Sequence, residues 1–175
     1  LDLAGRPNPS RPADQHDGRL TPPLPPPKMR ANKGSVMNDS QMPAAIEAHS
    51  PYSESLGMEV VAATLDEVIL RMPVTRTLTN RNGVLHGGAI MSLADHAAGT
   101  ATHLRLPPGA ATTTLESKTN FLRPIRLGDV AEARPRPLHL GRTTMIWQTD
   151  ILRSDGKLAA VVIQTQLVLE WKEPA

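Results

Sequence analysis

The spacing of hydrophobic and polar residues differs from one part of the chain to another, and these differences predict where its helices and strands lie. Residues 86–105 contain no proline and many alanines, and the segment stops before Pro107, Pro108 and Gly109, which predicts one long helix. In other segments apolar residues alternate with polar ones, or β-branched residues dominate, as is typical of strands. The expected strands cover residues 58–64, 67–74, 111–125, 129–140, 142–152 and 158–170.

The breaks between these segments indicate how they connect. The first two strands meet near Leu65 and Asp66, which predicts a hairpin. Before them, residues 44–56 are typical of a short helix that is interrupted at Pro51, because proline disfavours helix at the residue before it. Residues 75–83 are polar and predict a loop. Prolines at 135 and 137 favour an edge or bulged position for the strand that contains them.

The order of these elements is typical of an α+β domain. One long helix stands between two groups of strands, which argues against the repeated βαβ units of a parallel sheet. The strands after residue 110 form a meander whose apolar face needs cover, and helix 86–105 is the only sizeable candidate. We therefore expect an antiparallel β-sheet wrapped around one long central helix, in a domain that covers residues 44–172.

Residues 1–43 differ from this domain in composition. Nine of the 17 prolines lie there, and the run TPPLPPPKMR predicts a disordered, proline-rich extension, with a ligand for an SH3-type domain as the alternative. The chain has no cysteine, which excludes thiolate chemistry and fits a reducing compartment, the cytoplasm. No apolar stretch approaches the roughly 20 residues of a membrane helix. The formal charge of +2 gives no reason to expect a nucleic-acid partner.

The expected central helix is apolar nearly all round and carries one carboxylate, Asp95. Ile90, Leu93, Ala94 and their neighbours cover one broad side, and a helix of this kind is usually buried. Asp95 is therefore not expected on a wet face. Because a buried carboxylate is costly unless it is paired or hydrogen-bonded, Asp95 is either a satisfied structural residue or a catalytic group.

Glycines gather where this helix starts. Gly83, Gly87 and Gly88 allow a positive φ or a close approach of the backbone. The first amides of a helix have no internal partner and lie at the positive end of its dipole. A helix that opens on His86, Gly87 and Gly88 is thus expected to present bare N–H groups to an anion or an oxyanion. A tight turn into the helix is the structural alternative.

The separation of the two features limits how they work together. Gly87 and Asp95 are eight positions apart, about 12 Å along a helix at ~1.5 Å per residue, so one carbonyl cannot touch both. Either the presence of both groups on one helix is a coincidence, or each site takes its amides from one subunit and its Asp95 from another. Two such helices, antiparallel across a two-fold axis, bring the amide end of one toward the Asp95 of the other. An isologous dimer would then hold two shared sites.

A set of six residues in this region resembles the signature of a known family. Hotdog-fold acyl-CoA thioesterases of the 4-hydroxybenzoyl-CoA thioesterase superfamily, in the phenylacetate-pathway (PaaI-type) branch, carry Asn-x-x-Gly-x-x-His-Gly-Gly, then six residues, then Asp. The matching residues here are Asn80, Gly83, His86, Gly87, Gly88 and Asp95. The segment NFLRPIRLGD (120–129) resembles the family's strand and turn after the central helix. The resemblance covers roughly 44–170 and implies the hotdog fold and hydrolysis of an acyl-CoA thioester.

The resemblance also implies catalytic roles. Asp95 would be the general base or the nucleophile, and the Gly87 N–H would polarise the thioester carbonyl. Asn80 would orient the attacking water or hold the leaving-sulfur side, and His86 would position the loop and contact the substrate. A Ser or Thr on the strand after the helix often helps to hold the water in this family, and Thr114 is the best match.

Gly83, Gly88 and Arg123 are the expected substrate-binding residues. Arg123, Arg126 and Arg142 are the candidates for contact with the phosphates of coenzyme A, although arginines on a solvated surface are the plainer interpretation. No metal or organic cofactor is needed, because coenzyme A is part of the substrate. Family members form homodimers that commonly pair into dimers of dimers. The expected partners are thus an acyl-CoA and further copies of this chain.

The same residues also bear on two other functions and on a metal site. A hotdog enoyl-CoA hydratase or dehydratase would need a catalytic histidine paired with a carboxylate, but His96 adjoins Asp95 and adjacent helical residues point apart. A non-catalytic acyl-CoA-binding protein is the other alternative. His96 and His103 lie seven residues apart, about 10.5 Å along a helix, which is too far to share one ion.

Overall fold

The computed structural model describes residues 50–170. Its helices and strands, in chain order, are α2 (Pro51–Ser55), β1 (Glu59–Ala63), β2 (Val68–Pro73), the 3-10 turn η2 (Arg76–Leu78), α3 (Gly87–His103), β3 (Ala110–Phe121), β4 (Val130–Leu140), β5 (Thr144–Leu152) and β6 (Leu158–Glu170). The extension predicted over residues 1–43 and the first half of the helix predicted over 44–56 lie outside the described residues.

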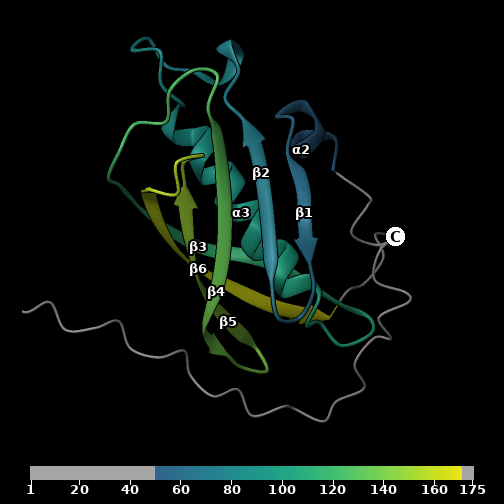
Figure 1. Cartoon of the computed structure of the whole chain (residues 1–175). Coiled ribbons are helices and arrows are strands. Elements are labelled where there is room, and N and C mark those ends of the chain that lie inside the picture. The colour runs from purple at the N-terminus through teal and green to yellow at the C-terminus, as the bar shows by residue number, and fades with distance from the viewer. Residues whose placement is uncertain (1–49, 171–175) are drawn as a thin grey trace, which may run out of the picture. The chain divides into compact units, whose positions relative to one another are not determined.

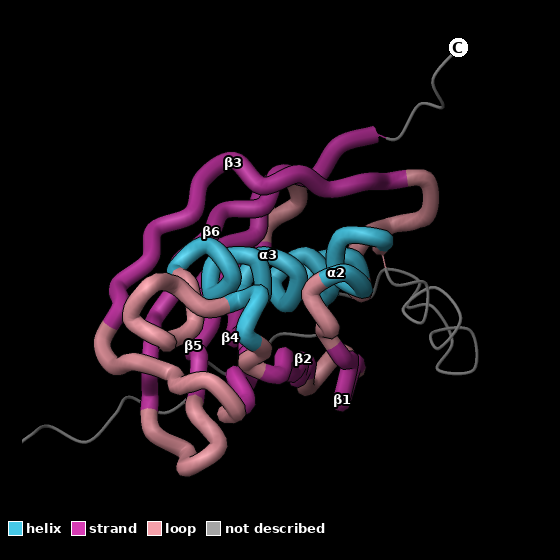
Figure 2. The backbone as a smooth tube through the Cα atoms, turned by 90° about the horizontal axis from the view of Figure 1, so that it is seen from above, coloured by secondary structure: helices cyan, strands magenta, loops and turns pink. Residues whose placement is uncertain are grey.

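The predicted α+β fold is confirmed. Six strands form one sheet in the order β1-β2-β4-β5-β6-β3, and every neighbouring pair is antiparallel. The sheet curves around α3, which lies in its concave side with α2 beside it (Figures 1 and 2). None of the helices within residues 50–170 is long and apolar enough to cross a membrane.

One side of α3 forms the centre of the core. Its buried residues are Ala89, Ile90, Leu93, Ala94, Ala97, Ala98, Ala101 and Thr102. The alanines let the helix approach the sheet closely, where Trp147, Ile151 and Val162 are all at most 1% exposed. This burial of apolar surface is the main stabilising term for a domain of this kind.

The C-terminal end of α3 is fixed by a buried polar chain. The indole N–H of Trp147 donates to Oγ1 of Thr102 at 2.8 Å, and that hydroxyl donates to the carbonyl of Ala98 at 2.9 Å. The guanidinium of Arg105 lies 5.0 Å from the Trp147 ring centre and donates to the carbonyls of Ala101 and Leu65. Carbonyls at the end of a helix lack internal partners, so these contacts stabilise the helix end.

Pro135 and Pro137 lie in a part of β4 that tolerates proline. β4 pairs with β5 along most of its length but with β2 only over its first four residues, Val130 to Ala133. Pro135 and Pro137 lie beyond that stretch, where the β2 side needs no N–H donor, and the register shifts between Pro137 and His139. The predicted bulge is therefore present. The first residues of β4 pair with a strand on each side, whereas the later residues pair with β5 alone.

The break predicted at Pro51 is present: Ser50 is extended and caps α2, which opens on Pro51 because the fixed φ of proline suits the first helical position. Two other predictions of local structure need correction. Residues 75–83 are not all loop, since η2 lies within them. The strand predicted over 111–125 ends at Phe121. The four residues beyond it include Pro124, which has no N–H to donate to a neighbouring strand.

β3 is the long edge strand of the sheet. It pairs with β6 on one side over Ala110 to Phe121, while β1 at the opposite edge has only five residues. Leu115 and Phe121 on β3 are each 55% exposed. A long edge with exposed apolar side chains is a ready site for pairing with another strand.

Candidate active site

The start of α3 is capped by the residue that precedes it. His86 has an extended backbone, and its Nδ1 accepts the N–H of Gly88 at 3.0 Å, which places the ring proton on Nε2. The prediction that this helix presents several bare N–H groups is therefore wrong for Gly88. Gly87, as the first helical residue, keeps an N–H that makes no hydrogen bond within residues 50–170.

A ring from the edge strand lies close to the Cα of Gly87. A Cβ added at Gly87 would come within 3.0 Å of Cζ of Phe121 and 3.4 Å of Cε1. Glycine at position 87 thus allows a close approach between the helix start and the end of β3. Phe121 covers one side of the Gly87 backbone with an apolar surface, which strengthens any hydrogen bond made there.

The segment before His86 is a tight turn that Asn80 and Gly83, two residues of the signature, stabilise. The N–H of Asn80 donates to the carbonyl of Val84 at 2.9 Å, and the N–H of Gly83 donates to the carbonyl of Asn80 at 3.0 Å. Gly83 has a φ of +70°, which favours glycine. Oδ1 of Asn80 accepts the N–H of Asn82 at 2.9 Å, which orients the side-chain amide and leaves its N–H groups available to a substrate.

Asp95 does not lie where the sequence analysis expects it. In the single chain its side chain is exposed, on a face of α3 that the sheet leaves uncovered. Its Oδ1 accepts two hydrogen bonds, from Oγ1 of Thr114 at 2.8 Å and from Nε2 of Gln164 at 2.7 Å. The carboxylate is therefore held in one orientation while its other oxygen, Oδ2, accepts no hydrogen bond from residues 50–170.

A second glutamine supports this arrangement from behind. Nε2 of Gln166 donates to Oγ1 of Thr114 at 2.8 Å, and Oε1 of Gln166 accepts from Oγ1 of Thr112 at 3.0 Å. Both glutamines are essentially fully buried. The predicted contact of Thr114 with the site is thus present as a hydrogen bond to Asp95, and the hydroxyl's only proton is used in it.

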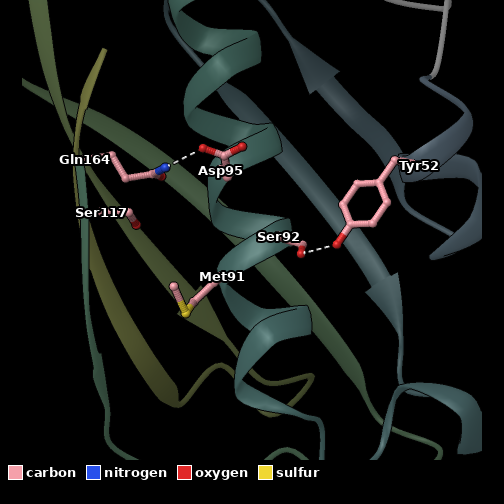
Figure 3. Close-up of a pocket in the computed structure, with 6 residues that line it drawn as sticks. All are labelled: Tyr52, Met91, Ser92, Asp95, Ser117 and Gln164. Carbon is pink, nitrogen blue, oxygen red and sulfur yellow. Dashed lines mark hydrogen bonds between the residues drawn. The ribbon is translucent and has the colours of Figure 1, made fainter. Parts of the chain in front are cut away.

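These groups surround a pocket with a volume of about 270 Å³, lined by Tyr52, Met91, Ser92, Asp95, Ser117 and Gln164. The α3 residues form its floor. Figure 3 shows Tyr52 on one side of the helix and Gln164 with Ser117 on the other. The Tyr52 side gives the pocket an aromatic wall, and the sheet side gives it amide and hydroxyl groups.

Tyr52 is tied to the helix through a serine. The hydroxyls of Tyr52 and Ser92 lie 2.7 Å apart, and the Ser92 hydroxyl donates to the carbonyl of Gly88 at 2.9 Å. Since the Ser92 proton is used in that bond, Tyr52 is the donor to Ser92. The bond holds α2 beside the first turns of α3 and sets the width of the pocket between them.

Other predicted groups lie outside the pocket lining. Arg123 uses Nη1 to donate to the carbonyl of Leu158 at 2.7 Å, which fixes the end of β3, and its remaining N–H groups face solvent. Within residues 50–170 no group of three or more His, Asp or Glu side chains could hold a metal ion. The structure thus brings Asp95 and Thr114 together, and gathers Gly87, Gly88 and His86 separately at the helix start.

Sequence reasoning missed Gln164, Gln166 and Ser117. The two glutamines had a readable signal, because they continue the inward-facing series of Ala160 and Val162 at a spacing of two. Ser117 had none. A bulge between Thr114 and Glu116 turns it onto the same side as Thr114, whereas strict alternation would place residues three apart on opposite faces.

Comparisons with known proteins identify the family of this chain. A family model described as "Thioesterase superfamily" matches residues 82–160. A Haemophilus influenzae protein named "Putative esterase" is 39% identical over 106 residues, which cover 61% of this chain and 76% of the relative. The 1,4-dihydroxy-2-naphthoyl-CoA hydrolase of Listeria monocytogenes is 29% identical over 108 residues, with coverages of 62% and 87%.

Among solved structures, the PaaI protein of the E. coli phenylacetic acid degradation operon superposes with a TM-score of 0.66 at 25% identity, over 71% of this chain and 88% of that one. The order of elements, the glycines before α3 and these relatives lead to one assignment. The chain belongs to the thioesterase superfamily, as a PaaI-like hydrolase with the hotdog fold.

Proposed function

We propose that this protein hydrolyses an acyl-CoA thioester to a carboxylic acid and free coenzyme A. The observation that carries the proposal is the Asp95 carboxylate, which Thr114 and Gln164 orient at an open pocket. A named acyl-CoA hydrolase among the relatives supports the substrate class. Asp95 acts as general base or nucleophile, the two roles that a fixed carboxylate beside an electrophilic carbonyl can take.

The Gly87 N–H supplies the second element of this chemistry. Attack on a thioester places negative charge on the carbonyl oxygen, and an unbonded amide at the positive end of a helix stabilises that charge. His86 holds the neighbouring Gly88 N–H, so it preserves the geometry of the helix start and leaves Gly87 as the donor.

The site requires two copies of the chain in this proposal. Gly87 and Asp95 lie eight residues apart on α3, about 12 Å at ~1.5 Å per residue, too far for one carbonyl. β3 offers the surface for pairing, since it is a 12-residue edge strand with exposed Leu115 and Phe121. A two-fold pairing along β3 gives an isologous dimer with two shared sites, and two dimers would form the tetramer expected for the family.

An activity panel tests the substrate class. The protein is incubated with acyl-CoA esters of aromatic, short, medium and long acyl groups, and released thiol is measured with a chromogenic disulfide. We expect turnover of at least one thioester. Absence of thiol release from every member would contradict the proposal, and addition of water to an enoyl-CoA, measured as loss of enone absorbance, would replace it with a hydratase.

A further inference from the structure

The inner face of β6 changes from apolar to polar beside the pocket. Its inward positions run from Ala160 and Val162 to Gln164 and Gln166, which are 0% and 1% exposed. A buried amide is costly when its groups lack partners. Gln166 is satisfied at both ends by Thr114 and Thr112. Gln164 is satisfied at one end only.

The free end of Gln164 is its oxygen. Since the Asp95 carboxylate only accepts hydrogen bonds, Nε2 is the Gln164 atom that bonds it, and Oε1 makes no hydrogen bond to Asp95. That Oε1 is buried and has no hydrogen-bond partner within residues 50–170. Gln164 is one of the residues that line the pocket, and its unpaired oxygen is buried within that lining.

A second unpaired group lies directly opposite. Ser117 is the cross-strand partner of Gln164, and partners of this kind have Cβ atoms about 4.5–5.5 Å apart. The Ser117 hydroxyl oxygen is also buried without a hydrogen-bond partner in the described chain, and it lines the same pocket. Figure 3 shows it beside the Gln164 side chain, on the sheet side of Asp95. Two orphaned polar groups and a half-satisfied carboxylate thus meet in one place.

These groups match the hydrogen-bonding needs of one water molecule. The Ser117 hydroxyl donates to it, while Gln164 Oε1 and Asp95 Oδ2 each accept one of its protons. Thr114 cannot serve in the same way, because its proton is already given to Asp95. The bulge in β3 is what places Ser117 rather than a neighbour at this point.

We propose that Gln164 and Ser117 seat the attacking water of thioester hydrolysis, and that Gln164 also aims Asp95 as the general base. This inference rests on the proposed function. The water oxygen attacks the thioester carbon as its proton passes to Asp95. The tetrahedral intermediate then expels the sulfur with the C–S electron pair, and the same proton moves from Asp95 to the thiolate. The products are a carboxylic acid and the coenzyme A thiol.

Two variants with matched controls test the seat on the full-length protein. Gln164→Leu removes both contacts of the amide, and Ser117→Ala removes the hydroxyl alone. Gln148→Leu is the control for the first, because Gln148 bonds Asp150 at 2.8 Å outside the pocket. Thr119→Val is the control for the second, because Thr119 carries another buried, unpaired hydroxyl on β3 outside the pocket lining.

We expect kcat for the best acyl-CoA to fall about 10- to 100-fold in each test variant, from loss of hydrogen bonds to the reacting groups. KM should change less than about threefold, and both controls should keep the wild-type rate. Test variants that keep wild-type kcat, while Asp95→Asn is inactive, would overturn the water seat and leave the proposed function standing. A wild type inert on every thioester would overturn both.

A single-turnover reaction in ¹⁸O-water gives a readout that a merely structural role would not move. With enzyme in excess, a water that attacks directly places ¹⁸O in the acid in the first turnover. A mixed anhydride with Asp95 would instead deliver ¹⁶O from the carboxylate to the acid if water opens it at the Asp95 carbon, and would leave one ¹⁸O on Asp95 in that case only. Mass spectrometry of the acid detects that route, and ¹⁶O product would overturn the inference while thioester hydrolysis remains.

Discussion

Thr114 on β3 donates a hydrogen bond of 2.8 Å to Oδ1 of Asp95 on α3. The edge strand of the sheet and the central helix are thereby joined at the site. With Gln164 on the same oxygen, the carboxylate has one oxygen fixed to the protein and one turned to the pocket. A carboxylate arranged in this way is oriented before substrate arrives, which lowers the entropic cost of the reaction.

Replacement of Asp95 by Asn should abolish most of the activity without loss of fold. The Asn carbonyl can still accept from Thr114 and Gln164, so the geometry is kept while the base is removed. We expect kcat for an acyl-CoA to fall about 10²- to 10⁴-fold, the usual contribution of a general base. Asp150→Asn is the control, since Asp150 binds Gln148 in a similar way outside the pocket. Full activity of the Asp95 variant would remove Asp95 from the mechanism.

The contribution of the Gly87 amide can be isolated by comparing Gly87→Pro with Gly87→Ala. Proline suits the first position of a helix, and His86 before it is already extended, so the substitution deletes the N–H with little change of backbone. Both variants add a Cβ that presses on the Phe121 ring. We expect kcat to be about 10²- to 10³-fold lower in the proline variant than in the alanine variant. Equal rates would show that this N–H stabilises no charge.

Thr102→Val should destabilise the fold. The substitution leaves the buried Trp147 N–H without the acceptor that it now has at 2.8 Å. An unsatisfied buried donor costs about 1–3 kcal/mol, which urea unfolding measures as a lower midpoint. Thr100→Val is the control, because its hydroxyl makes the same kind of bond to a carbonyl four residues earlier and holds no indole. The prediction fails if both variants unfold at the same urea concentration.

Because of Glu132, the free energy of unfolding should fall as the pH is lowered into the acid range. Burial raises the pKa of its carboxyl, but hydrogen bonds from Arg134 and Arg71, at 2.7 and 2.8 Å, outweigh burial and hold the pKa below its ordinary 4.5. The unfolded chain therefore binds more protons, and the stabilisation is complete above about pH 4.5 and lost as the pH falls through the folded pKa. The difference in unfolding free energy between wild type and Glu132→Gln should shrink from pH 6 to pH 3. A constant difference would contradict this.

Most of the fold follows from periodicity in the sequence. The long alanine-rich run between a glycine pair and a Pro-Pro-Gly stop predicts α3 to within two residues at either end. The alternating segments that follow predict β4, β5 and β6 nearly to their bounds. These elements are set by local signals that a single chain carries in full. The start of α2 at Pro51 does not follow from the sequence alone, because proline is compatible with both the interruption and the start of a helix.

The site was predicted less completely, for reasons that lie in tertiary structure. The apolar character of α3 indicates burial, but not that one face carrying Met91, Ser92 and Asp95 stays open beside β3. The bulge after Thr114 is a backbone feature with no proline or glycine to mark it. Likewise, the motif indicates that His86 matters but not that its ring caps Gly88. The roles of the remaining motif residues stay predictions.

The shared site can be tested by making a mixed dimer. Asp95→Asn and Gly87→Pro chains are co-expressed with different affinity tags, and the dimer that carries both tags is purified and assayed for thiol release. One of its two sites then pairs an intact amide with an intact carboxylate, so about half of the wild-type activity per dimer should return, although each variant alone is nearly inactive. A mixed dimer as inactive as its parents, or a chain that runs as a monomer at assay concentration, would contradict a site built from two copies.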